Sequence, residues 1–255
     1  MLRFLTIILF FLGTLNLSAQ VKYGKITYLQ TSEMVWESEN EIETPQDKQI
    51  KEMMSKMQAG GAFNKNYEAT FSPTAFNCVE IKKEAAEMSV DLGDGSSITV
   101  MTSDDPPVHY HTNTATGGIT NRDNIFDRSF LVTGQPAAVE WTLTGEKVAP
   151  SEMTAGLDLL LATGITDTND TITAGYAPSM PVQVGPLNYY GLPGAIITLE
   201  IPKGKSKIVY RATGIELSSE PVDVEQPTEG KAVSLEKFRK EKTKREKAME
   251  RTYRN

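Results

Sequence analysis

The chain has 255 residues, of which 39% are hydrophobic and 23% are charged, a composition typical of a globular protein with one large domain or two small ones. Its net charge is −7, and residues 231–255 contribute +6 through ten Lys or Arg and four Glu, which leaves −13 on the rest. An acidic body excludes nucleic acid as the main partner, because phosphate binding requires clustered Lys and Arg. The single cysteine, Cys78, excludes an internal disulfide.

The N-terminal segment has the pattern of a secretion signal. Arg3 precedes an apolar run from Phe4 to Leu12, and Ala19 offers a small residue at which a signal peptidase can cut. A membrane anchor is the alternative, but a span needs about 20 apolar residues, and polar residues interrupt this run. We expect residues 1–19 to be removed and the mature protein to be periplasmic or secreted.

The region from residue 20 to residue 215 has the pattern of a β-rich domain. Short segments alternate apolar and polar residues, as half-buried strands do, and turn signals such as Gly117-Gly118 and Gly134-Gln135-Pro136 separate them. This spacing predicts a mainly β, antiparallel fold: a curved sheet, a sandwich or an open barrel. The clearest strand segments contain Ile26/Tyr28, Phe76/Cys78, Ile98/Val100, Val139/Trp141, Ile172/Ala174/Tyr176, Ala195/Ile197/Leu199 and Ile208/Tyr210.

Two segments are helical candidates. Residues 46–58 are rich in helix formers and end at Gly60-Gly61, and residues 234–254 are nearly all Lys, Arg, Glu and other helix formers. Residues 216–230 hold prolines, serines and acids and are typical of a linker. The basic tail, residues 231–255, is therefore expected to be a helix or a disordered arm, with peripheral contact to an anionic membrane, docking on the acidic body and a solvated helix as alternatives.

Both histidines of the chain lie in one short segment. His109 and His111 point to the same face if this segment is a strand, and Asp104 and Asp105 precede them closely. Two imidazoles and a carboxylate would suit zinc or copper, so a periplasmic metal-binding protein is one functional hypothesis. A pair of solvent-facing histidines is the alternative.

The sequence holds no G-x-S-x-G, H-E-x-x-H or G-x-G-x-x-G motif. We therefore predict no catalytic residues, and no resident cofactor other than the zinc or copper of the histidine hypothesis.

The segment from Gly185 to Ile197 has an unusual density of Gly, Pro and Tyr. Pro193 fixes φ and Gly194 tolerates positive φ, which predicts a type II turn leading into the apolar strand from Ala195. On this interpretation Gly185, Pro186, Gly191, Pro193 and Gly194 form a structural corner. The functional alternative is a ligand or partner surface built from Tyr189, Tyr190 and Leu192.

These residues resemble the GLPGLI family, secreted proteins of Bacteroidetes named for that motif. Gly185-Pro186, Tyr189-Tyr190 and Gly191-Leu192-Pro193-Gly194 stand in the family's order, while Ala195 departs from its final Leu. The resemblance implies no established activity. It favours a non-catalytic binding or accessory protein whose partner is a protein or an apolar ligand of the cell envelope.

Overall fold

The computed structural model describes residues 22–35, 44–82, 88–91, 97–100 and 106–253. The predicted signal peptide, residues 1–19, and the candidate ligands Asp104 and Asp105 lie outside the described residues. Neither helix in the described ranges combines the length and the apolar composition that a membrane span requires.

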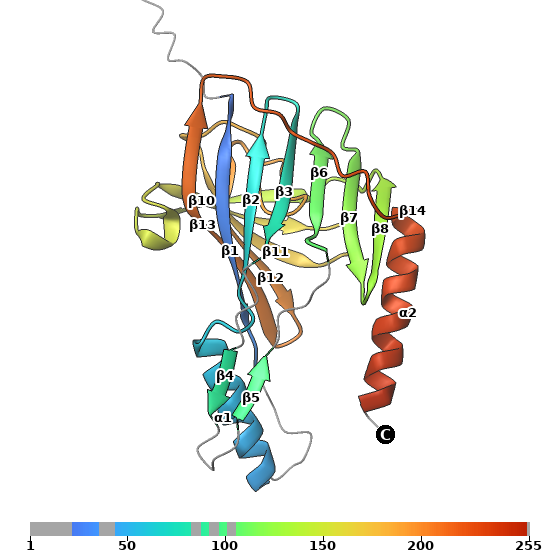
Figure 1. Cartoon of the computed structure of the whole chain (residues 1–255). Coiled ribbons are helices and arrows are strands. Elements are labelled where there is room, and N and C mark those ends of the chain that lie inside the picture. The colour runs from blue at the N-terminus through green and yellow to red at the C-terminus, as the bar shows by residue number, and fades with distance from the viewer. Residues whose placement is uncertain (1–21, 36–43, 83–87, 92–96, 101–105, 254–255) are drawn as a thin grey trace, which may run out of the picture.

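One sheet of 12 strands forms most of the described chain, in the order β14-β8-β7-β6-β3-β2-β1-β13-β12-β11-β10-β9 (Figure 1). Neighbouring strands are antiparallel except β14 and β8, which are parallel. The strands are β1 (Tyr23–Glu33), β2 (Lys65–Phe71), β3 (Ala75–Ile81), β6 (His109–Asn113), β7 (Ile119–Ile125), β8 (Arg128–Gly134), β9 (Glu140–Val148), β10 (Leu159–Ile165), β11 (Thr171–Ala177), β12 (Ala195–Lys203), β13 (Ser206–Ser218) and β14 (Lys231–Ser234).

The remaining elements are few. A separate hairpin pairs β4 (Met88–Asp91) with β5 (Ser97–Val100), and a 3-10 turn, η1, covers Glu152–Thr154. The helices are α1 (Pro45–Ala59) and α2 (Leu235–Tyr253), within a residue or two of the predicted segments. Figure 1 shows α1 and the β4–β5 hairpin together beyond one end of the sheet.

The prediction of a mainly β, antiparallel fold is confirmed: one unclosed sheet of 12 strands fits the expected curved sheet or open barrel. The sheet does not close, since β14 and β9 are its two edges. The pairing register of β1 with β13 shifts between Thr27 and Tyr28, and that of β11 with β12 shifts between Gly175 and Tyr176. Such bulges increase local twist and bend the strands, so one face of the sheet becomes concave.

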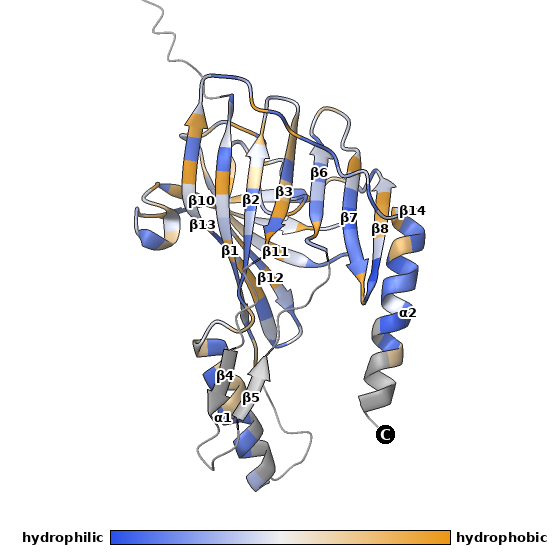
Figure 2. Ribbon diagram, viewed as in Figure 1, coloured by the Kyte–Doolittle hydropathy of each residue, from blue (hydrophilic) through white to orange (hydrophobic). Residues whose placement is uncertain are grey.

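The core lies on the concave face. Along β1 the buried positions alternate with partly exposed ones, and Ile26 and Tyr28 are fully buried, as half-buried strands require. Figure 2 shows the same mixture of hydrophobic and hydrophilic residues along the other strands. The loop between β11 and β12, residues 178–194, packs into this face through Val184 and Leu192. The Tyr28 hydroxyl donates to the carbonyl of Ile196 at 2.6 Å, which joins β1 to the strand after the loop.

The single cysteine belongs to this core. Cys78 is fully buried and has no disulfide partner. Burial raises the pKa of its thiol to about 12, so the thiol stays protonated and behaves as a small apolar side chain.

The chain after β13 wraps around the sheet. Residues 219–230, called here the strap, cross β2, β3, β6 and β7 before reaching β14 (Figure 1). The strap was predicted as a linker, but it packs on these strands. The Asn77 side chain donates to the carbonyl of Glu225 at 3.4 Å, and Arg122 forms an ion pair with Glu229 at 3.1 Å. Pro227 of the strap is buried.

The basic tail, expected to be a helix or a disordered arm, begins instead with strand β14 and then forms α2, which docks beside β8. Phe238 is 5% exposed and its ring meets that of Phe130 edge to face, with the centroids 5.6 Å apart. Arg239 donates two hydrogen bonds to the carboxylate of Asp167 in the β10–β11 turn, at 2.9 and 3.2 Å. The helix therefore connects strands from both ends of the sheet.

We predict that Phe238→Ala releases α2 from the sheet. Truncating a buried Phe costs about 3 kcal/mol, whereas an exposed ion pair supplies about 0–1 kcal/mol. Hydrogen exchange should show loss of amide protection in α2 while β1, β2 and β13 stay protected. The control is Lys237→Ala, because Lys237 is exposed on the same helix. Equal protection of α2 in both variants would show that the Phe238–Phe130 contact does not hold the helix.

Candidate functional site: a tyrosine-lined cavity

A cavity of about 820 Å³ opens on the concave face of the sheet. Its wall comes from β1, β2, β3, β6, β7, β12 and β13, its inner end from the β11–β12 loop, and its opposite side from α2 and the β10–β11 turn. Four tyrosines line it: Tyr67, Tyr110, Tyr189 and Tyr210. Most small-molecule sites have a volume between about 300 and 1,000 Å³ and an aromatic lining with a few polar groups, and this cavity fits that description.

Three side chains from distant parts of the sequence form one polar cluster in the wall. The hydroxyls of Tyr67 and Tyr210 both donate to Oε1 of Gln30, at 3.2 and 3.1 Å. The two rings lie 5.9 Å apart between centroids, and Gln30 is 8% exposed. Burial raises the pKa of both tyrosines, so their hydroxyls remain neutral hydrogen-bonding groups.

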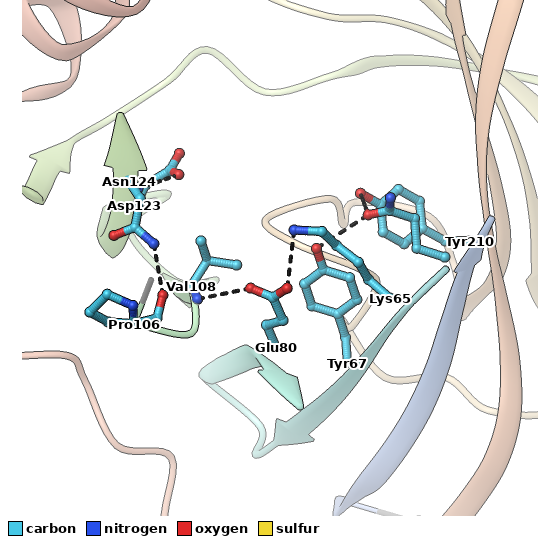
Figure 3. A network of polar contacts seen from close by, with 9 residues as sticks. Lys65, Tyr67, Glu80, Pro106, Val108, Asp123, Asn124 and Tyr210 are labelled. Atoms are coloured by element: carbon cyan, nitrogen blue, oxygen red, sulfur yellow. Dashed lines mark hydrogen bonds and ion pairs between the residues drawn. The ribbon is translucent and has the colours of Figure 1, made fainter. Parts of the chain in front are cut away.

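Several charged side chains in the lining are joined in pairs. Glu80 is 7% exposed; its carboxylate contacts Lys65 Nζ at 3.0 Å and accepts from the backbone N–H of Val108 at 3.3 Å. Figure 3 shows this network beside Tyr67 and Tyr210. On the α2 side, Lys242 lies 3.7 Å from Asp123. Pairing stabilises these charges where a lone buried ion would be costly.

The glycine- and proline-rich motif closes the inner end of the cavity. Leu187, Asn188 and Tyr189 line it. The Asn188 amide donates to Thr112 Oγ1 at 2.8 Å and accepts from the Asn121 amide at 2.8 Å. Asn121 also accepts from the backbone N–H of His111 at 3.1 Å. These bonds fix the loop against β6 and β7.

We predict that Asn188→Ala destabilises the protein by about 1–3 kcal/mol, because the buried Asn121 amide loses its partner. The measurement is the midpoint of urea unfolding. Asn188→Asp keeps the acceptor for Asn121 and should lose less. A loss below about 0.5 kcal/mol in Asn188→Ala would mean that this network does not anchor the loop.

The predicted type II turn with positive φ at Gly194 is wrong. Positive φ occurs at Gly191, at 104°, and not at Gly194. Gly194 is needed for a different reason: a Cβ there would lie 2.2 Å from the carbonyl oxygen of Ala177. Close packing rather than turn geometry therefore accounts for Gly194.

Of the three residues predicted as a ligand or partner surface, the structure brings one to the cavity. Tyr189 lines it. Tyr190 packs edge to face on Phe76, 6.0 Å between centroids, and its carbonyl accepts from Trp141 Nε1 at 2.9 Å. Leu192 is 1% exposed within the core. Leu192 therefore offers no surface, because packing of the loop into the concave face buries it.

The two histidines lie on the other face of the sheet. Tyr110 lines the cavity, so its neighbours His109 and His111 in β6 point away from it. The His109 ring lies 3.2 Å from the carbonyl of Glu225 in the strap, and His111 is 4% exposed. Within the described ranges, no group of three or more His, Cys, Asp or Glu side chains could hold a metal ion. The zinc or copper site stays a prediction, since Asp104 and Asp105 lie outside the described residues.

Burial lowers the pKa of His109 and His111, and the nearby Arg122 lowers that of His109 further. A folded pKa below the usual value of about 6.5 means that the neutral rings stabilise the fold. This contribution is complete above about pH 6.5 and is lost as the pH falls below that value toward the folded pKa.

We therefore predict that the free energy of unfolding falls between pH 7.5 and pH 5. The fall should be smaller in the double variant His109→Gln, His111→Gln, measured by urea unfolding at both pH values. If wild type and variant had parallel pH profiles, the histidines would not be the titrating groups.

Comparison with known protein families finds a match for one part of the chain. Residues 140–198 match a family model described as "Protein of unknown function (Porph_ging)". This range runs from β9 into β12 and contains the whole loop at the inner end of the cavity. No curated protein matches the chain in sequence. A solved structure of PNGF-II is similar with a TM-score of 0.45 and 11% identity, over 86% of this chain and 32% of that one. The chain therefore spans about a third of that protein's length.

Sequence reasoning missed most of the cavity. Gln30, Tyr67, Tyr110 and Tyr210 lie on four different strands, and none belongs to a recognisable motif. The local signal was a polar side chain on the face of a strand that should be buried. In β1, for example, Gln30 follows Ile26 and Tyr28 at the same spacing of two residues.

Proposed function

We propose that this protein is a non-catalytic binding protein of the cell envelope that holds a small ligand in the tyrosine-lined cavity. The observation that carries the proposal is the cavity itself, about 820 Å³ in volume and lined by four tyrosines on the concave face. Two supports for the location are the signal-like N-terminus and the order of residues in the motif from Gly185.

The arrangement of the lining supports binding of a ligand with an apolar body. Leu187, Ile201 and Ile208 present aliphatic surface beside the tyrosine rings. Aromatic and aliphatic surface that is covered on binding contributes about 25 cal/mol per Å². Rigid strands and the anchored loop hold these side chains in place before a ligand arrives, which reduces the entropic cost of binding.

The helix α2 supports the proposal by completing the cavity. Phe238, Arg239 and Lys242 all line it, and the contacts with Phe130, Asp167 and Asp123 hold them there. The tail thus has a role in forming the cavity, and the membrane contact predicted for its basic residues is not required by this proposal.

We also propose that the chain is a divergent member of the GLPGLI family. The motif that carries this resemblance lies within residues 140–198, the range that matches the family of unknown function. That family brings no activity, so the binding proposal rests on the cavity.

The test is a cavity-filling substitution. Ile208→Phe places a ring in the cavity, whereas Ile81→Phe adds the same ring at a position that is 44% exposed and outside the lining. Protein purified gently from its own envelope fraction should carry a bound small molecule, detected by native mass spectrometry. We expect Ile208→Phe to reduce the bound fraction at least about tenfold, equivalent to about 1.4 kcal/mol, and Ile81→Phe to leave it unchanged.

Two results would count against the proposal. Wild-type protein without any adduct would leave the cavity without a resident ligand. An adduct retained equally by Ile208→Phe and wild type would place the bound molecule elsewhere on the protein.

A further inference from the structure

The polar groups that line the cavity divide into two kinds. The charged ones in its wall are paired within the protein: Lys65 with Glu80, Lys242 with Asp123 and Arg239 with Asp167. Of the other lining charges, Asp170 accepts from the Thr168 hydroxyl at 2.6 Å, and Lys82 and Lys203 are exposed to solvent. A ligand charge would have to compete with these partners or with water.

The second kind is uncharged and has hydrogen-bonding capacity to spare. The two tyrosine hydroxyls that donate to Gln30 Oε1 fix its carboxamide. The Nε2 group of this amide donates no hydrogen bond to any described residue, although Gln30 is 92% removed from solvent and lines the cavity. Among the described residues no buried side-chain nitrogen or oxygen atom lacks a hydrogen-bond partner, so this nitrogen faces the open cavity. An amide nitrogen carries two donors, and both are available to a ligand there.

Tyr110 and Tyr189 add two more such groups. Each lines the cavity from a different element, β6 and the β11–β12 loop, and neither hydroxyl has a hydrogen-bond partner among the described residues. Burial is the first cause that raises the pKa of both, so both hydroxyls are neutral donors and acceptors.

We propose that the ligand is an uncharged molecule whose hydroxyl or amide groups bind Gln30, Tyr110 and Tyr189, while its apolar body lies on the aliphatic lining. This inference rests on the proposed function and adds the chemical class of the ligand. Donors in the cavity wall favour a ligand that accepts their hydrogen bonds. An uncharged ligand avoids the desolvation cost of an ion, which the wall cannot offset with charges already paired within the protein.

The test uses three probes that share one alkyl chain and differ in the head group: n-octyl β-glucoside, n-octanoate and n-octyltrimethylammonium. Binding to the full-length mature protein, freed of endogenous ligand, is measured by isothermal titration below the concentration at which each probe forms micelles. We expect the glucoside to bind at least about tenfold more tightly than either charged probe.

Substitutions then assign the preference to the polar groups. Gln30→Leu should weaken glucoside binding about tenfold and leave octanoate binding unchanged, and Gln226→Leu, at an exposed position in the strap, is the matched control. Because Gln30→Leu also removes the partner of Tyr67 and Tyr210, Tyr110→Phe is the second variant. It breaks no hydrogen bond to a described residue and should weaken glucoside binding in the same direction.

The outcomes separate the two proposals. Equal binding of all three probes, or tighter binding of a charged probe, would overturn the inference about ligand class while leaving the cavity as a binding site. Failure of all three probes to bind would overturn both. A glucoside preference that neither Gln30→Leu nor Tyr110→Phe reduces would also overturn the inference.

Discussion

The structure depends on how the concave face of an open sheet is covered. A closed barrel buries its inner face by closure, but here β14 and β9 remain separate edges, so another part of the chain must cover the apolar surface. The β11–β12 loop does this at one end, with Val184 and Leu192 in the core and Asn188 bonded to β6 and β7. What the loop leaves uncovered is the cavity.

The loop also explains why the motif has its composition. A segment that packs inside a curved sheet must satisfy its backbone polar groups and approach other backbone closely. The N–H of Ile196 bonds to the carbonyl of Val184, and that of Ala195 to the carbonyl of Met180. Gly194 passes Ala177 without room for a Cβ. The same residues that form a structural corner therefore shape the inner end of the candidate site.

The C-terminal region covers the concave face at the opposite side of the cavity. The strap crosses the other face of the sheet, and β14 pairs with β8 at its edge, so α2 is delivered to the side of the cavity that the loop does not reach. Phe238 is the well-buried aromatic of this charged helix, and Leu235 packs on the same cluster. Ion pairs to Asp167 and Asp123 at the cavity margin add to this apolar contact.

The sequence by itself determined many of the elements, since alternation along β1 and β12 and the runs of helix formers in α1 and α2 are local properties of the chain. It also marked the motif from Gly185 as structural. It did not mark β2, β10 or β14 among its clearest strand segments. Only the tertiary structure decided which residues meet. Gln30 and Tyr210 are 180 positions apart, and Tyr67 and Tyr110 lie on β2 and β6. Their meeting follows from strand order and sheet curvature, which depend on long-range pairing that no local pattern records.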